Sequence, residues 1–388
     1  MRPVPTAGRP GATERARGVT EAAVRELARY RGDPAVTSLY LDVNGGHRPV
    51  SADYMAAFER LGTDVHRRAR TSGDSRLPRA VGADVERMRA WLARDLDRSA
   101  TRGLGLFSCS DQAFFRAVEL PRSVRDRAGF GPAPYVRQLW AVLDERERFL
   151  IALVDRRRLR ILRVDLGEIS ELAAADDLEP RAIDTSIELG GFQRHDEDLA
   201  RAHYRRAAGL VERAEGDRPA TRLVLGGPDA AVAALEAHLR PQVRHRIVGR
   251  VGVRVSAPPQ EVAAAARAVA ETAERRHEAE VVEHLRQGAA GDHRAVIGLE
   301  PTLAAIARGR IATLVVSEDF TGPGARCPSC GWIGADVRLC PTCGTTTVGI
   351  DDVVELAVGE ALAHDADVEL CRGSDLDTFG RIGALEHL

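Results

Sequence analysis

Lysine is absent from this chain of 388 residues, so all 55 of its basic side chains are arginine. They are balanced by 57 acidic side chains, which gives a formal net charge of −2. The net charge is too small to indicate which kind of partner the protein binds. Any anionic partner would meet guanidinium groups, whose planar donors suit phosphate. The arginine content does not by itself establish such a partner, because a GC-rich genome produces the same bias.

Long apolar runs are absent too, and no uninterrupted stretch approaches the roughly 18 residues that a membrane span requires. The first segment, MRPVPTAGRPGATERARG, lacks the apolar centre of a secretory signal and predicts a disordered leader over residues 1–18. Cysteines are few, and four of the six are clustered, which favours a metal site in a reducing compartment over a disulfide framework. These absences predict a cytoplasmic protein with no membrane contact.

Segments with strand-like and helical patterns alternate along the rest of the chain, which predicts an α/β fold. The length favours more than one domain, and we predict three α/β domains. The predicted domains are an N-terminal domain over 19–133, a middle domain over 134–275 and a C-terminal domain over 276–388. The segment LGGPD, which starts at Leu225, lacks the ending of a phosphate-binding loop and predicts a tight turn between a strand and a helix.

Four cysteines form two matched pairs in CPSCG and CPTCG, separated by nine residues: Cys327, Cys330, Cys340 and Cys343. Each short spacing lets one tight turn present two thiolates, and Gly331 and Gly344 permit the turn. Redox-active cysteine pairs would show the same local spacing, but two matched pairs favour tetrahedral zinc. With four protein ligands, the Zn²⁺ ion is predicted to be structural, in a zinc ribbon over 325–346 inserted in the C-terminal domain.

The middle domain opens with RFLIALVDRRRLRILRVD, which predicts two strands joined at a basic turn. The segment IELGGFQRHDED follows, and it is expected to form a loop before a helix that starts near Asp196. Paired glycines are common in ordinary turns. Other features of the chain must therefore indicate whether this segment has a further role.

In the order of its α/β domains, its glycine segment and its zinc ribbon, the chain resembles the archaeo-eukaryotic class I release factors and Pelota. It is more similar to their bacterial relatives, which include the hibernation factor Balon. The resemblance implies that the glycine segment enters the ribosomal peptidyl-transferase centre, where a Gly-Gly-Gln motif helps water attack the peptidyl-tRNA ester. Gly190, Gly191 and Gln193 match that motif as candidate catalytic residues, and Phe192 has no counterpart. The extra residue lengthens an extended segment by about 3.3–3.6 Å.

Arginine and histidine residues around this segment are candidates for contact with tRNA or ribosomal RNA. They are Arg156, Arg157, Arg158, Arg194, His195, Arg201, Arg205 and Arg206, and Arg160 is expected in the same basic turn as the first three. The competing interpretation is a solvated helix face, in which these side chains pair with Asp196, Glu197 and Asp198.

The segment RTSGDSRLP, over residues 70–78, occupies the place of the Asn-Ile-Lys-Ser loop that reads stop codons in the family, and shares nothing with it. Arg67, Arg68, Arg70 and Arg76 nearby are expected to face phosphates of the decoding region. The resemblance thus implies a monomeric factor in the ribosomal A site that rescues stalled ribosomes by hydrolysing peptidyl-tRNA without reading a stop codon. A non-hydrolytic hibernation factor and a zinc-ribbon interaction protein unrelated to the ribosome stay open, as does delivery by a translational GTPase.

Overall fold

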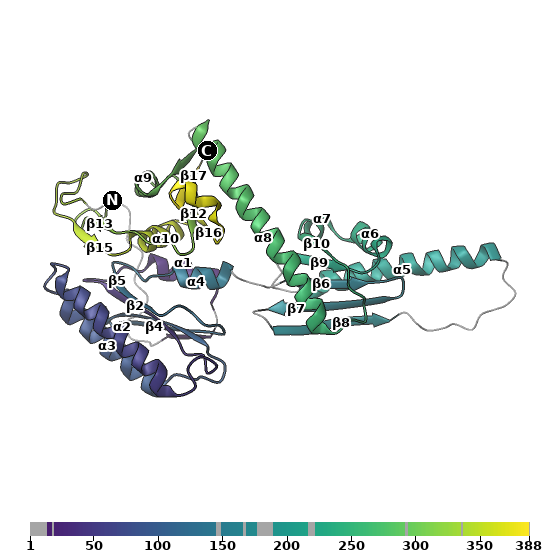
Figure 1. Cartoon of the computed structure of the whole chain (residues 1–388), viewed down its shortest axis with the longest axis horizontal. Coiled ribbons are helices and arrows are strands. Elements are labelled where there is room, and N and C mark those ends of the chain that lie inside the picture. The colour runs from purple at the N-terminus through teal and green to yellow at the C-terminus, as the bar shows by residue number, and fades with distance from the viewer. Residues whose placement is uncertain are drawn as a thin grey trace. The chain divides into compact units, whose positions relative to one another are not determined.

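The computed structural model describes residues 14–17, 19–144, 149–165, 168–176, 189–215, 222–291, 294–334 and 337–387. The chain divides into two compact units. Unit 1 consists of Met1–Glu145 together with Glu278–Leu388, and unit 2 is Arg146–His277 (Figure 1). Among the described residues, no helix has both the length and the apolar character that crossing a membrane requires.

The first sheet of unit 1 has the strand order β1-β4-β3-β2-β5. Its strands are β1 (Glu14–Arg17), β2 (Val36–Asp42), β3 (Gly103–Cys109), β4 (Phe114–Leu120) and β5 (Arg127–Gly131). Helices α2 (Ser51–Thr71) and α3 (Leu77–Arg94) pack on one face, where Leu39 and Leu41 point. Tyr40 points to the opposite face, which α1 (Glu21–Arg29) and α4 (Arg137–Asp144) cover. The alternation along β2 therefore serves two separate cores.

Part of the predicted leader is ordered, which corrects the sequence-based expectation. Glu14–Arg17 form β1, which pairs in parallel with β4 from Arg116 to Glu119. The sequence ERAR carries no β-branched or aromatic residue, so its strand character was invisible from the side chains. An edge strand can be held by main-chain hydrogen bonds alone. Residues 1–13 and 18 lie outside the described part of the chain.

The second sheet of unit 1 has the order β11-β17-β12-β16. Its strands are β11 (Ala295–Ile297), β12 (Ile311–Ser317), β16 (Asp367–Cys371) and β17 (Ile382–Glu386), and its helices are α9 (Leu299–Ala307) and α10 (Val353–Ala363). A turn of 3-10 helix, η2 (Ser374–Phe379), precedes β17. A small sheet, β14-β13-β15, is inserted between β12 and α10, with β13 (Gly324–Arg326), β14 (Ile333–Gly334) and β15 (Val348–Ile350).

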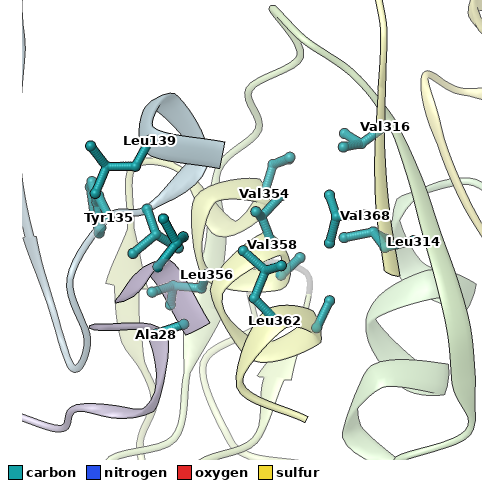
Figure 2. Packing of buried hydrophobic residues seen from close by; sticks show 14 of the residues in the cluster. Ala28, Tyr135, Leu139, Leu314, Val316, Val354, Leu356, Val358, Leu362 and Val368 are labelled. Atoms are coloured by element: carbon teal, nitrogen blue, oxygen red, sulfur yellow. The ribbon is translucent and has the colours of Figure 1, made fainter. Parts of the chain in front are cut away.

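One apolar core joins the N-terminal and C-terminal parts of unit 1. Figure 2 shows Leu356 of α10 near Ala28 of α1, while Val358 of the same helix faces Leu314 and Val368 of the second sheet. Helix α10 is buried on nearly all sides, as expected for a helix whose residues are apolar except for two glutamates. The domains predicted over 19–133 and 276–388 thus share their packing, and the division into three domains stays a prediction.

Unit 2 contains a sheet of order β10-β9-β6-β7-β8. The strands are β6 (Phe149–Val154), β7 (Arg158–Asp165), β8 (Glu168–Asp176), β9 (Arg222–Gly226) and β10 (Ile247–Val251). Strands β6, β9 and β10 are parallel, whereas β6, β7 and β8 form an antiparallel meander. Helices α5 (Leu189–Glu215), α6 (Asp229–His238) and α7 (Pro241–Arg244) lie on one face, and α8 (Pro259–Ala290) packs on the other. The predicted α/β class and the paired strands with a basic turn are confirmed.

A buried carboxylate, Asp84, ties α3 to the first sheet. Its Oδ2 atom accepts a hydrogen bond from the Thr37 hydroxyl at 2.7 Å. Its Oδ1 atom accepts bonds from the Ser108 hydroxyl at 2.8 Å and from the Ser110 amide and hydroxyl at 2.7 and 2.6 Å. Burial is the largest effect and raises the pKa of Asp84, and the hydrogen bonds offset it only in part.

This pKa shift predicts how Asp84→Asn changes stability with pH. A carboxyl group whose pKa is raised by folding favours the folded state below its unfolded pKa of about 3.9, and that contribution is lost as the pH rises through the folded pKa. We therefore expect the free energy of unfolding of the variant to exceed that of the wild type at pH 7, with the difference shrinking toward pH 4. Urea denaturation across this range measures it. A variant that is less stable than the wild type at pH 7 would contradict the role of burial.

Candidate metal centre and arginine groove

The two CxxC segments form turns with the same hydrogen bonds. In the first, the Gly331 amide donates to the Cys327 carbonyl at 3.1 Å, and in the second the Gly344 amide donates to the Cys340 carbonyl at 2.9 Å. The two glycines have φ values of 77° and 73°, a backbone region that other residues avoid. The expectation that glycine permits each turn is therefore confirmed.

The four cysteine sulfur atoms converge, and all lie within 4.8 Å of one another. The Sγ atoms of Cys327 and Cys343 are 3.4 Å apart, and those of Cys330 and Cys340 are 3.5 Å apart. Four sulfurs bonded at about 2.3 Å to one tetrahedral ion would be separated by roughly 3.8 Å. None of the four is in a disulfide, so the cluster fits a metal ion held by four thiolates.

Local polar groups favour the thiolate form that a metal ion binds. The Thr345 hydroxyl lies 3.3 Å from the Cys343 sulfur, and hydrogen bonds from this side chain and its amide lower the pKa of Cys343 to about 6. The Cys340 sulfur accepts the Thr342 amide at 3.4 Å. Deprotonation is therefore easier at Cys340 and Cys343, whereas the pKa of Cys330, which faces the other three sulfurs, is raised to about 12.

The metal cluster is anchored to the core of unit 1. Cys327 directly follows β13, and Ile333 of β14 is buried in the same apolar cluster as Val353 at the start of α10. Gly324 lies so close to α10 that an added Cβ would be 2.6 Å from the Cβ of Val353. The ribbon is therefore a packed part of the unit. Cys109 and Cys371 are buried elsewhere and do not join the cluster, as expected.

The glycine segment lies in a helix, which corrects the predicted loop. Helix α5 begins at Leu189, so the backbone of Gly190, Gly191, Phe192 and Gln193 forms its first turns. Leucine, glutamine and arginine beside the glycines favour helix, and the first amides of a helix need no intrahelical acceptor. Helix α5 therefore begins before Asp196, the residue near which the sequence predicted its start. The side chains of 189–196, which include Arg194 and His195, and all of 177–188 lie outside what is described.

A groove of about 760 Å³ lies between the β6–β7 turn and helices α5 and α6. Its rim carries four of the predicted RNA-binding residues, Arg156, Arg157, Arg158 and Arg201. An apolar wall is formed by Ala200, Tyr204, Pro228, Ala230, Ala231 and Ala234, and Asp155, Glu197 and His238 complete the lining. We refer to this site as the arginine groove.

One carboxylate fixes the backbone of the β6–β7 turn, which carries three consecutive arginines. The Oδ1 atom of Asp155 accepts the amides of Arg157 at 2.8 Å and Arg158 at 2.7 Å. Such a side-chain cap fixes the backbone and leaves the side chains of Arg156, Arg157 and Arg158 exposed. The turn thus presents positive charge at the end of β6.

The opposite wall is brought close by a glycine. Gly227 follows β9 with a φ of 125°, and an added Cβ would lie 1.9 Å from the Val154 carbonyl oxygen at the end of β6. Only glycine allows these two parallel strand ends to approach so closely. Pro228 then caps α6, which confirms the predicted turn between a strand and a helix. The groove lies at the carboxyl ends of parallel strands, a common place for ligand sites in α/β proteins.

Some of the predicted basic residues form ion pairs within unit 2, and others are exposed. Arg160 leaves the cluster, because its guanidinium pairs with Glu171 at 2.9 Å and donates to the Val255 and Ala257 carbonyls. Arg201 pairs with Asp198 at 3.2 Å and Glu197 at 3.9 Å, as the solvated-face interpretation expected, although it also lines the groove. Arg205 and Arg206 are exposed on α5 outside the groove lining.

Sequence reasoning placed Tyr204 near the basic helix face but missed the alanines of the apolar wall and the position of His238 in the groove. These residues come from α5 and from the segment after β9, and alanine carries no chemical signature that marks a site. The two segments meet only in the folded chain, where β6 pairs in parallel with β9 and α5 and α6 pack on the same face of the sheet.

Of the predicted decoding-region residues, Arg67, Arg68 and Arg76 are in ion pairs within unit 1. Residues 72–76 connect α2 and α3, and Arg76 pairs with Asp74 and Asp33, both at 3.0 Å. Arg68 pairs with Asp64 at 3.0 Å and Asp351 at 2.9 Å. Contact with phosphates at this end of the chain stays a prediction.

Comparison with protein families gives one match. Residues 134–271 match the family described as bacterial archaeo-eukaryotic release factor family 10. For this part of the chain, the match confirms the resemblance expected from the sequence. No curated protein matches the chain.

Similar structures are more distant. An archaeal translation termination factor, aRF1, is 16% identical over 96% of this chain and 99% of its own, with a TM-score of 0.27. Dom34 of S. cerevisiae, a translation termination-like factor, is 9% identical over 75% of each chain, with a TM-score of 0.39. Ribosome-bound archaeal Pelota is 11% identical over 96% of this chain and 95% of its own, with a TM-score of 0.39. At such scores these likenesses support no conclusion about function.

Proposed function

We propose that this chain, whose residues 134–271 match a bacterial family of archaeo-eukaryotic release factor relatives, is a translation factor that binds the ribosomal A site. The matched range is the observation that carries the proposal, since it contains Gly190–Gln193 and every residue of the arginine groove. The guanidinium groups of the groove supply phosphate contacts of the kind that a ribosomal site offers.

In the first form of the proposal, the factor rescues stalled ribosomes by releasing the nascent peptide. Gln193 would orient water at the peptidyl-tRNA ester, and Gly190 and Gly191 would let the backbone approach. Gly190 and Gly191 stand in the first turn of α5, where the amides have no intrahelical acceptor and glycine adds no side chain that would hold the turn. The first turns of α5 can therefore open into an extended segment at low cost when the factor binds.

A second form, hibernation without hydrolysis, is favoured by Phe192. The residue lengthens the segment relative to the Gly-Gly-Gln motif, and reacting groups are sensitive to displacements near 1 Å. A protein that occupies the centre without chemistry needs no such precision. In either form, the four-thiolate cluster would hold a structural zinc ion, because four protein ligands leave no open position for water.

Peptide release from stalled ribosome–peptidyl-tRNA complexes tests these forms. If the chain is an esterase, Gln193→Ala should slow release by about 100-fold or more, the scale of losing one group that stabilises a transition state. Gln242→Ala is the matched control, since Gln242 is an exposed glutamine of unit 2 outside the segment and the groove lining.

Ribosome pelleting, run in parallel, separates the remaining outcomes. Tight pelleting without release, with release appearing when Phe192 is deleted, would establish hibernation. The absence of pelleting under all conditions would overturn both ribosomal forms and leave a zinc-ribbon interaction protein.

A further inference from the structure

The arginine groove has two chemically different sides. The lining contains four guanidinium groups, those of Arg156, Arg157, Arg158 and Arg201, and two carboxylates, those of Asp155 and Glu197. Outside the lining, Asp198 also pairs with Arg201 at 3.2 Å. Asp155 is already committed to the backbone of its own turn, and Glu197 lies 3.9 Å from the Arg201 guanidinium. An anionic ligand is therefore favoured at the rim.

The other lining residues are mostly apolar, and apart from Tyr204 their side chains are small. Ala231 and Tyr204 are buried, Ala200 and Ala234 are half-buried, and Pro228 and Ala230 are exposed. A site that served only to hold phosphates along a backbone would not need such a wall, because phosphate contacts come from charged and polar groups. The small side chains leave room for a flat apolar group against the wall.

The groove's size, about 760 Å³, is within the range of small-molecule sites. A nucleotide fits both sets of lining side chains, because its base is flat and its phosphates are anionic. In a duplex the base is stacked and paired, so it could not reach the wall, whereas an unstacked base of a single strand can. The two sides of the groove together select for an exposed nucleotide.

We propose that the arginine groove binds one unstacked nucleotide of single-stranded RNA, with its base against the apolar wall and its phosphates on the rim arginines. The choice of RNA rests on the proposed function. The lining itself favours a ligand that joins an anionic part to a flat part, and a free mononucleotide is the alternative source of the same chemistry.

Fluorescence anisotropy of the full-length protein with labelled oligonucleotides tests the inference. The probes are a single-stranded RNA, the same RNA in a blunt duplex, and an abasic ribose-phosphate strand of equal length. We expect the single strand to bind about tenfold more tightly than the other two, the scale of one base contact. Excess AMP should compete poorly.

Two variant pairs locate the binding. Ala230→Glu places a carboxylate on the wall, while Ala233→Glu places one on an exposed position of α6 outside the groove lining. Arg157→Glu reverses one charge on the rim, while Arg275→Glu makes the same charge change at an exposed position of α8. The first member of each pair should weaken single-strand binding by about tenfold, and the second should not.

Equal binding of the single strand, duplex and abasic strand, or equal effects within a pair, would overturn the inference. AMP binding as tight as that of the strand would make the groove a mononucleotide site and would also overturn it. Ribosome pelleting of the same variants keeps the two proposals separate. Pelleting without single-strand binding rejects the groove inference alone, and single-strand binding without pelleting rejects the ribosomal function alone.

Discussion

Cys340→Ala is expected to abolish metal binding and to unfold the small sheet β14-β13-β15. Cys340 is one of four converging sulfurs, and its Sγ atom lies 3.5 Å from that of Cys330. Structural zinc sites contribute about 10–16 kcal/mol of apparent binding free energy at neutral pH. Three remaining thiolates cannot complete the tetrahedral set, so most of that free energy is lost.

The effect should extend into the core of unit 1. Ile333 of β14 packs in the cluster that contains Val353 of α10, and Gly324 of β13 lies directly against that helix. When the ribbon unfolds, this side of α10 becomes exposed. We therefore expect a lower free energy of unfolding for unit 1 as a whole, in addition to the loss of the ion.

Metal content per chain, measured by mass spectrometry of the purified protein, checks the prediction. The wild type should carry one equivalent of zinc and Cys340→Ala none. Cys109→Ala and Cys371→Ala are the matched controls, because both cysteines are buried but lie outside the cluster. An equivalent of zinc retained by Cys340→Ala, or lost from a control, would show that the ion is held elsewhere.

The metal centre was predictable from sequence because its chemistry is local. Two short spacings place each pair of thiolates in one turn, and Gly331 and Gly344 mark where the backbone must enter the left-handed region. Only the approach of the two turns is a tertiary event. The arginine turn after β6 was predictable for the same reason, since Asp155 organises its own neighbours.

The apolar wall of the arginine groove was not predictable in this way. Ala200 and Ala231 lie on different helices, and their proximity depends on the pairing of β6 with β9 and on Gly227 between β9 and α6. Sequence periodicity identifies a buried face but not the element that covers it. The start of α5 was misplaced because paired glycines predict a turn, whereas the first turn of a helix also tolerates them.

The shared core of unit 1 was missed although its signal is present. The sequence of α10, VVELAVGEALA, is apolar except for two glutamates, which indicates a helix covered on nearly all sides. The sheet of the C-terminal part alone would cover only one side of α10. The N-terminal part of the chain supplies the second cover, through α1 and α4.

Arg137→Ala is expected to lower the free energy of unfolding of unit 1 by about 3–5 kcal/mol. The Arg137 side chain, on α4, is 5% exposed and lies 3.2 Å from Asp352 and 3.3 Å from Glu355 at the start of α10. Glu355 also accepts the Arg137 amide at 2.9 Å, and Asp352 accepts the Val354 amide at 3.1 Å as the helix cap. Removing the guanidinium leaves two buried carboxylates whose remaining cationic partner, among the described residues, is Arg127.

Guanidinium denaturation followed by tryptophan fluorescence measures this change in unit 1 alone. The three tryptophans all belong to unit 1, and Trp140 lies on α4, where its indole donates to the Val368 carbonyl at 2.8 Å. Arg31→Ala is the matched control, because Arg31 pairs with Glu360 of the same α10 at 3.0 Å but is 40% exposed. Exposed pairs contribute about 0–1 kcal/mol, so the control should change little.

A double variant, Arg137→Met with Glu355→Leu, distinguishes an unpaired charge from lost packing. Replacing a buried ion pair by apolar side chains of similar size is often neutral, so the double variant should recover part of the loss. Equal effects of Arg137→Ala and Arg31→Ala would show that burial of the network adds nothing to stability. A double variant less stable than Arg137→Ala would show that the pair itself, and not the stranded carboxylates, holds the two parts of unit 1 together.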